Sequence, residues 1–83
     1  MPLFMDEHND VDGLTAEAVA GAHQKDLDVQ SKHGVQYLQY WFNEQAGKVY
    51  CLVEAPNTEA AEAVHREAHG LVADELIEVQ EGS

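Results

Sequence analysis

Hydrophobic side chains recur with the two-residue period of strands in some segments and with the longer period of helices in others. Residues 35–42 (VQYLQYWF) and 48–55 (KVYCLVEA) are rich in β-branched and aromatic side chains, which favour strands. The Gly-containing segment 43–47 between them predicts a hairpin turn. Residues 2–8 and 74–80 are further stretches that predict strands. The pattern therefore predicts four strands, two of them joined directly.

Two longer segments have the pattern of amphipathic helices. The first follows Thr15, whose hydroxyl is a good N-cap, and runs to about Lys32 before Gly34 ends it. The second begins at Thr58 and ends near Gly70. The predicted order of elements is therefore β-α-β-β-α-β, all within one domain of residues 1–83.

This order predicts an α+β fold, the ferredoxin-like sandwich. Right-handed crossovers give an antiparallel four-stranded sheet of order 4-1-3-2, with both helices on one face. Strict alternation in the second strand places Tyr37 and Trp41 on one face and Leu38, Tyr40 and Phe42 on the other. Since both faces carry apolar side chains, we expect the open face of the sheet to pack against a second subunit, giving a homodimer.

The net charge of the chain limits the kinds of partner that it can bind. Sixteen acidic and four basic residues give a formal net charge of −12, which repels nucleic acids and anionic membranes and attracts cations. The single cysteine, Cys51, excludes an internal disulfide and a CxxC motif. There is no signal-peptide pattern and no apolar run near the ~20 residues of a membrane span. We therefore expect a soluble cytoplasmic protein.

The histidines supply the candidate chemistry. His65 and His69 lie one turn apart beside the apolar stripe of the second helix, a spacing at which two imidazoles can share one ion. His8 ends the first strand, in the same half of the predicted fold. His23 lies near the centre of the apolar stripe of the first helix, whose other members are Ala16, Val19, Ala20, Leu27 and Gln30.

Carboxylates extend this set. Asp6 shares a strand face with His8, and Glu54 ends the strand 48–55. Imidazoles combined with carboxylates suit nickel, zinc, copper or non-haem iron. The sequence therefore predicts a metal site, with Ni²⁺ as the first candidate and Zn²⁺ or another divalent transition metal as the alternative. Its candidate ligands are His65, His69, His23, His8, Asp6 and Glu54.

Three segments carry a resemblance to a known family: AEAVAGAHQKDLDVQ (16–30), YWFNEQAGKVYCLVEAPN (40–57) and AVHREAHGLVADELIEV (63–79). They resemble small bacterial proteins of largely undefined function, among them nickel-binding members that form ferredoxin-like dimers. VHREAHG is the most distinctive piece. The resemblance implies a dimeric α+β sandwich and nickel binding, and it extends to His23, Asp26, Trp41, Cys51, Glu54, His65 and His69.

Two other functions fit the same residues. In the first, His23 acts as a buried base beside Cys51 or Tyr40, in the pocket of a small dimeric α+β barrel enzyme. In the second, the chain is a regulatory module that dimerises and binds a small ligand or a protein. No nucleophile motif or phosphate-binding loop supports an enzyme. We therefore favour metal buffering or sequestration, and Cys51 is expected to be a buried, inert thiol.

Overall fold

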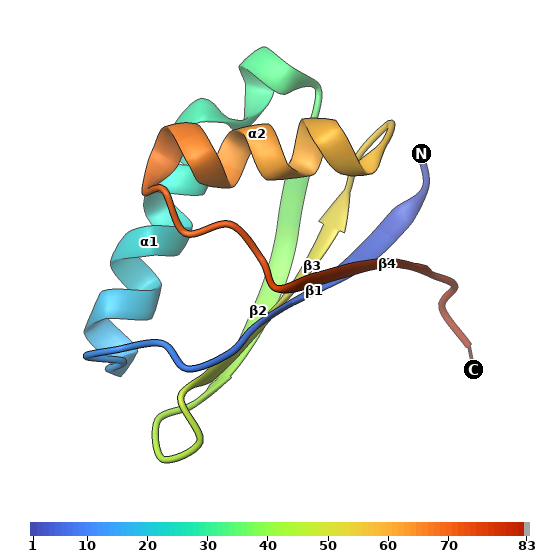
Figure 1. Cartoon of the computed structure of the whole chain (residues 1–83). Coiled ribbons are helices and arrows are strands. Elements are labelled where there is room, and N and C mark those ends of the chain that lie inside the picture. Colours follow the sequence, from blue (N-terminus) through green and yellow to red (C-terminus); the bar gives the residue numbers. More distant parts are fainter. Residues whose placement is uncertain (83) are drawn as a thin grey trace.

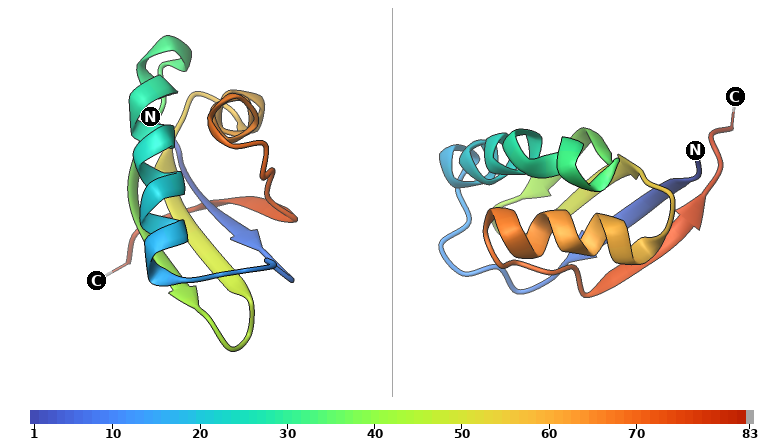
Figure 2. Two further views of the ribbon diagram at one scale, coloured as in Figure 1. Left: turned by 90° about the vertical axis from the view of Figure 1, so that its left-hand side faces the viewer. Right: turned by 90° about the horizontal axis from the view of Figure 1, so that it is seen from above.

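The computed structural model describes residues 1–82. These residues form an antiparallel sheet with strand order β2-β3-β1-β4, which is the predicted order 4-1-3-2 read from the opposite edge. Two helices lie side by side on one face of the sheet (Figures 1 and 2). The ferredoxin-like fold is thus confirmed. Its elements are β1 (Leu3–His8), α1 (Ala16–Val29), the 3₁₀ turn η1 (Gln30–His33), β2 (Gln36–Asn43), β3 (Lys48–Glu54), α2 (Thr58–Ala68) and β4 (Glu75–Val79).

The central strands β1 and β3 alternate regularly between buried and partly exposed positions. The sequence left open which face of β1 points to the helices, and the structure assigns Phe4, Asp6 and His8 to that face. On β3 the buried positions include Cys51, which pairs directly with Asp6. This alternation therefore places two polar side chains of β1 beneath the helices, in an otherwise apolar layer.

A β-bulge interrupts β2. Its register against β3 shifts between Tyr37 and Gln39, so Tyr37 and Tyr40 both lie opposite inward-facing residues of β3. Trp41 lies on the open face of the sheet and is 44% exposed. The predicted sharing of one face by Tyr37 and Trp41 is wrong, because one extra residue reverses the side-chain alternation that follows it. The bulge also brings the Tyr40 ring to 4.8 Å from the ring of His23.

The buried face of α1 also differs from the predicted stripe. The two buried residues of this helix are Val19 and Asp26, whereas Ala16 and Ala20 are exposed and Leu27 is 36% exposed. The helix has few large apolar side chains to fix its rotation. Asp26 instead points inward, because histidines of α2 provide hydrogen-bond partners for its carboxylate.

The second helix ends near Gly70, as predicted. Asn57 caps its start by accepting a hydrogen bond from the Ala60 backbone N–H at 2.9 Å. Its last residue is Ala68 and its C-cap is His69, and Leu71 beyond the helix is 52% exposed. His65 turns fully inward and is 2% exposed, although the sequence placed it at the edge of the apolar stripe.

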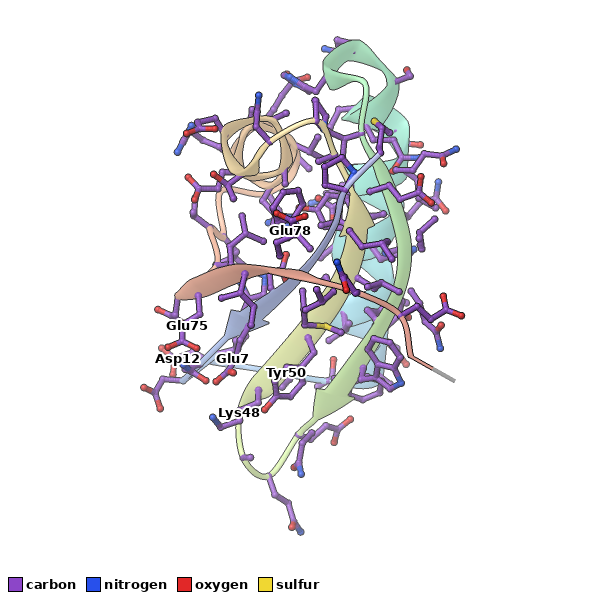
Figure 3. All side chains as sticks on the ribbon, turned by 90° about the vertical axis from the view of Figure 1, so that its right-hand side faces the viewer. Glu7, Asp12, Lys48, Tyr50, Glu75 and Glu78 are labelled. Carbon is purple, nitrogen blue, oxygen red and sulfur yellow. The ribbon has the colours of Figure 1, made fainter. Side chains whose placement is uncertain are left out.

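The open face of the sheet is apolar over much of its area and charged at one end. Met5, Trp41 and Tyr50 line a shallow hollow on this face. At the charged end the Lys48 ammonium lies 3.2 Å from the Glu7 carboxylate (Figure 3). Within residues 1–82, none of the helices is long and apolar enough to cross a membrane.

Candidate metal centre

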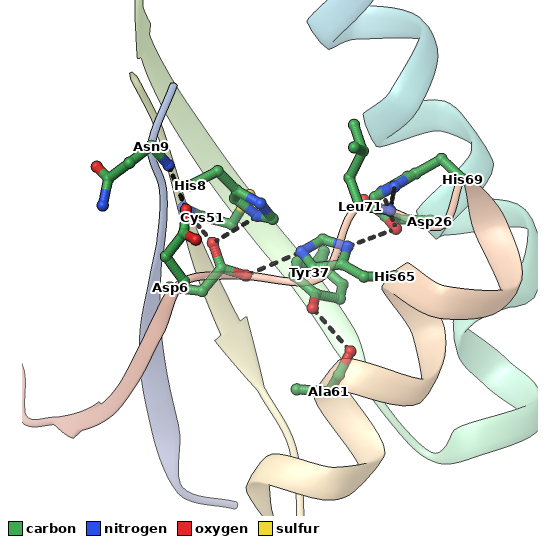
Figure 4. Close-up of polar contacts among 11 residues, drawn as sticks. Asp6, His8, Asn9, Asp26, Tyr37, Cys51, Ala61, His65, His69 and Leu71 are labelled. Atoms are coloured by element: carbon green, nitrogen blue, oxygen red, sulfur yellow. Dashed lines mark hydrogen bonds and ion pairs between the residues drawn. The ribbon is translucent and has the colours of Figure 1, made fainter. Parts of the chain in front are cut away.

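The imidazole of His65 lies between two carboxylates beneath the helices (Figure 4). Its Nδ1 atom is 2.9 Å from Oδ1 of Asp26 on α1, and its Nε2 atom is 2.9 Å from Oδ2 of Asp6 on β1. All three residues are buried, at 1–2% exposure. Three elements that are distant in the sequence thus meet at one histidine.

Two more histidines extend this arrangement at its ends. His69 Nε2 is 3.1 Å from Oδ1 of Asp26, and His8 Nε2 is 3.4 Å from Oδ1 of Asp6. The Cys51 backbone N–H donates to the same Asp6 oxygen at 3.1 Å. The result is a continuous series of alternating imidazoles and carboxylates, which is buried except at the partly buried His69. We call it the His–Asp chain; its members are His8, Asp6, His65, Asp26 and His69.

Tyr37 fixes the position of the central imidazole. Its ring centroid lies 4.5 Å from that of His65, with the planes tilted by 31°. Its hydroxyl donates to the Ala61 carbonyl one turn earlier on α2, at 2.9 Å. Burial raises the pKa of the Tyr37 hydroxyl, and the nearby Asp6 and Asp26 carboxylates raise it further. Tyr37 is therefore a neutral donor that anchors the sheet to α2 beside His65.

The carboxylates determine the protonation state of His65. Burial by itself would lower the pKa of His65, but its hydrogen bonds to Asp26 and Asp6 outweigh burial and raise the pKa to about 9. Burial would raise the pKa of Asp6, but the bonds to His65 and His8 bring it down to about 2. The pKa of Asp26 is lowered in the same way. At neutral pH His65 is therefore an imidazolium that donates to both carboxylates.

Two groups of side chains in this region have the spacing of metal ligands. In each group the donor atoms all lie within 4.8 Å of one another. One group is Asp6, His8, Cys51 and His65, all buried; the other is Asp26, His65 and His69. His65 belongs to both groups because its two ring nitrogens point in opposite directions. The chain therefore offers alternative positions for an ion on either side of one imidazole.

The predicted ligands divide into two sets. His65, His69, His8 and Asp6 come together, as the preceding distances show. His23 lies beside them without joining either group, and Glu54 follows inward-facing Val53 on β3, so it points to the open face.

Two ligand candidates, Asp26 and Cys51, were absent from the predicted ligand set. Asp26 lies three residues after His23, at the edge of the predicted apolar stripe. An acidic residue at the edge of that stripe is the sequence signal that could have identified it. Cys51 was named but interpreted as inert. Its position opposite Asp6 depends on strand register, which the sequence pattern alone did not fix. Burial and then the Asp6 charge raise the pKa of the Cys51 thiol.

A cavity of about 70 Å³ opens beside the His–Asp chain, between α1, the sheet and the end of α2. Its walls are mainly apolar and include Val19, Ala22, Val49 and Leu71. His8, Cys51, His65 and His69 border it on the side of the chain, so a small ion or molecule can reach them from outside.

The fold and this cluster together define the class of protein: a small α+β domain in which buried imidazoles and carboxylates have the spacing of metal ligands. Comparison with protein-family models identifies the family: residues 4–79 match the model described as nickel responsive protein SCO4226-like. The chain therefore belongs to the SCO4226-like family of nickel responsive proteins.

One solved structure supports this placement. The crystal structure of SCO4226 from Streptomyces coelicolor A3(2) superposes with a TM-score of 0.91 and is 40% identical in sequence. The match covers 98% of this chain and 99% of that one. A comparison with curated proteins gives no match. The recognised resemblance and the fold are both confirmed, and the family description adds responsiveness to nickel.

Proposed function

We propose that this protein binds a divalent transition metal ion, with Ni²⁺ first, through Asp6, His8, His65 and Cys51. The observation that carries this proposal is the convergence of four buried donor groups from β1, β3 and α2 within 4.8 Å of one another. Donors bound to one such ion lie roughly 3–4 Å apart. Small side-chain adjustments would therefore bring these four groups onto one ion.

The chemistry of the donors suits a borderline transition metal. Two imidazole nitrogens, one carboxylate oxygen and one sulfur favour nickel, zinc, cobalt or copper over magnesium or calcium, which prefer oxygen alone. Binding would require the Cys51 thiol to lose its proton, which a coordinated metal ion promotes. The family description favours nickel within this group of metals.

The rest of the His–Asp chain would support the ligands. If His65 binds through Nε2, its Nδ1–H remains free to donate to Asp26, which fixes the ring and makes it a better ligand. His69 contacts the same Asp26 oxygen and completes this support. The alternative group of Asp26, His65 and His69 has three donors, one fewer, and His69 is only partly buried. We therefore assign the ion to the Asp6 side of His65.

A buffering or sequestering role follows from the whole chain. The formal net charge of −12 raises the local concentration of cations, and the cavity gives an ion a route to the ligands. An enzymatic role has less support. His23 lines a cavity, but no carboxylate within residues 1–82 bonds to the unpaired Nδ1 of its ring, and the raised pKa of Cys51 makes its thiol a poor nucleophile.

We further propose that two chains pair through the open face of the sheet. Large apolar side chains remain accessible there: Trp41 is 44% exposed and Ile77 is 60% exposed. Burying such a surface against a second copy removes apolar area from water. Metal binding does not require this pairing, because both ligand groups lie on the other face of the sheet, within one chain.

The deciding experiment is Ni²⁺ titration calorimetry with elemental analysis, on protein purified without a His-tag or a nickel column. We expect stoichiometric binding that weakens at least ten-fold in His8→Gln and in Asp6→Asn. His33→Gln is the matched control, because His33 is partly exposed and, among residues 1–82, its ring is hydrogen-bonded only to Glu67. Unchanged Ni²⁺ affinity in both cluster variants, with folding verified by circular dichroism, would place the nickel elsewhere and refute this site.

A further inference from the structure

The cavity beside the His–Asp chain has features that metal binding does not require. An ion needs only a narrow route, whereas this space is about 70 Å³ in volume. Its walls come from α1 and the residues just before it, from the sheet and from the segment after α2. They are mainly apolar, and one side is formed by Leu14, Ala18, Val19 and Ala22. The apolar part of these walls provides no ligand for an ion, but it suits the body of a small organic molecule.

Three polar residues that line this cavity lie outside the His–Asp chain: His23, Tyr40 and Cys51. Among them, His23 has an unpaired ring nitrogen. Its ring packs on Tyr40 at a centroid distance of 4.8 Å, tilted by 45°. Its Nδ1 atom is buried and has no hydrogen-bond partner among residues 1–82. Leaving a buried ring nitrogen unpaired is unfavourable, so an unpaired nitrogen on a residue that lines the cavity points to a missing partner.

We propose that this cavity binds a small neutral molecule, about the size of a five-membered azole, that hydrogen-bonds to His23. A modest rotation of the imidazole about its Cβ–Cγ bond would turn a ring nitrogen toward the occupant. The Tyr40 ring and the Val19 and Val49 side chains would pack against the body of the molecule. This inference goes beyond metal binding, since it requires no ion.

Size and charge define this ligand class. An apolar cavity of ~150 Å³ accepts benzene, so a space about half as large suits a smaller ring. The buried carboxylates of Asp6 and Asp26 and the net charge of −12 disfavour an anion. The apolar walls disfavour a strongly hydrated cation. A neutral azole avoids both penalties, because it has an apolar ring and can donate or accept a hydrogen bond.

The test is a titration of ¹⁵N-labelled, metal-free protein with pyrazole, followed by NMR. We expect saturable shifts at the backbone amides of Ala18, Ala22 and Val49, with acetate at equal concentration producing none. Ala22→Leu, which fills the cavity, should weaken pyrazole at least ten-fold. Ala20→Leu is the matched control, because Ala20 is exposed on the same helix, and it should leave binding unchanged.

A second variant tests the hydrogen bond independently of the cavity volume. His23→Phe keeps an aromatic ring against Tyr40 and removes both nitrogens, and it should weaken pyrazole at least five-fold. Three results would overturn the proposal: no saturable shift at 50 mM pyrazole, equal effects of Ala22→Leu and Ala20→Leu, or unchanged affinity in His23→Phe. Since all samples are metal-free, these results do not depend on whether the nickel site is correct.

Discussion

At the scale of single residues, the hydrogen bonds of His65 compete with its proposed role as a metal ligand. As an imidazolium it donates to Asp6 and Asp26 and neutralises part of their buried charge. As a metal ligand it would have to give up one of these protons. The raised pKa of His65, about 9, measures how strongly the metal-free protein holds that proton. Metal binding at this site must therefore release protons.

The first prediction concerns the pH dependence of nickel affinity. Because His65 must lose a proton below its pKa of about 9 and the Cys51 thiol, whose pKa is raised, must lose another, apparent Ni²⁺ affinity should rise about 100-fold per pH unit, or about 10⁴-fold between pH 6 and pH 8. Calorimetry in buffers of different ionisation enthalpy measures the protons released, and we expect about two per ion. Binding without proton release would contradict the use of His65 as a ligand.

The second prediction concerns the stability of the metal-free protein. The pKa of His65 rises from 6.5 to about 9 on folding, so its contribution is complete below pH 6.5 and lost as pH rises through 9. The pKa of Asp6 falls from 3.8 to about 2, so its contribution is present above pH 3.8 and lost as pH falls through 2. Thermal unfolding should show greatest stability near pH 4–6.5 in wild type. His65→Gln should remove the alkaline decline, and a decline of equal size in this variant would show that another group causes it.

The third prediction separates the two ligand groups. Asp26→Asn removes the charge that orients His65, so it should lower unfolding free energy by about 1–3 kcal/mol and weaken Ni²⁺ about 10–100-fold without changing stoichiometry. Asp28→Asn is the control, because Asp28 is exposed and, within the described part of the chain, its carboxylate accepts a side-chain hydrogen bond only from Gln24. Denaturant unfolding and calorimetry measure both effects. If Asp26→Asn abolished Ni²⁺ binding while Asp28→Asn did not, the ion would instead be assigned to the group of Asp26, His65 and His69.

At the scale of elements, the bulge in β2 determines which aromatic side chains surround the site. With its extra residue, Tyr37 and Tyr40 both face the helices, and they contact the rings of His65 and His23 respectively. Without it, the alternation would place Tyr40 on the open face. The strand thereby supplies one aromatic support to the His–Asp chain and another to the cavity.

The fourth prediction tests the link between β2 and α2. Tyr37→Phe removes only the hydroxyl that donates to the Ala61 carbonyl, and it leaves that buried acceptor unpaired. Unfolding free energy should fall by about 1–2 kcal/mol. Tyr50→Phe is the control on the open face, and it should change stability by less than about 0.5 kcal/mol. Equal effects in urea unfolding would mean that the Tyr37 hydrogen bond adds no stability.

At the scale of the whole molecule, the two faces of the sheet carry different features. The helix-covered face carries the His–Asp chain and the cavity, whereas the open face carries accessible apolar side chains. A chain of 83 residues has a small core, and pairing through the open face would add buried apolar area to it. The proposed dimer would thus stabilise the fold without altering the site.

The fifth prediction tests this pairing. Met5 lies in the hollow of the open face with Trp41 and Tyr50, so Met5→Glu would place a charge at the centre of the proposed interface. Analytical ultracentrifugation should show a dimer in wild type and a monomer in this variant. Ala20→Glu adds the same charge on exposed α1 and should remain dimeric. A monomeric wild-type protein would disprove the pairing.

The sequence by itself determined the order of elements and the topology of the sheet. Strand and helix periods, Thr15 and Gly34 at helix ends, and the Gly-containing hairpin are local signals, and the handedness of crossovers leaves few ways to connect four strands. It also identified most of the cluster, because His65 and His69 are close in the sequence and His8 and Asp6 share one short strand.

The tertiary structure decided which of these side chains meet. Asp6 and Asp26 lie 59 and 39 residues from His65, and no local pattern reports contacts over such separations. The rotation of α1 follows from the partners available to the Asp26 carboxylate, and the face of Tyr40 follows from a bulge in strand pairing. Both depend on long-range hydrogen bonds, which form only when distant segments pack together.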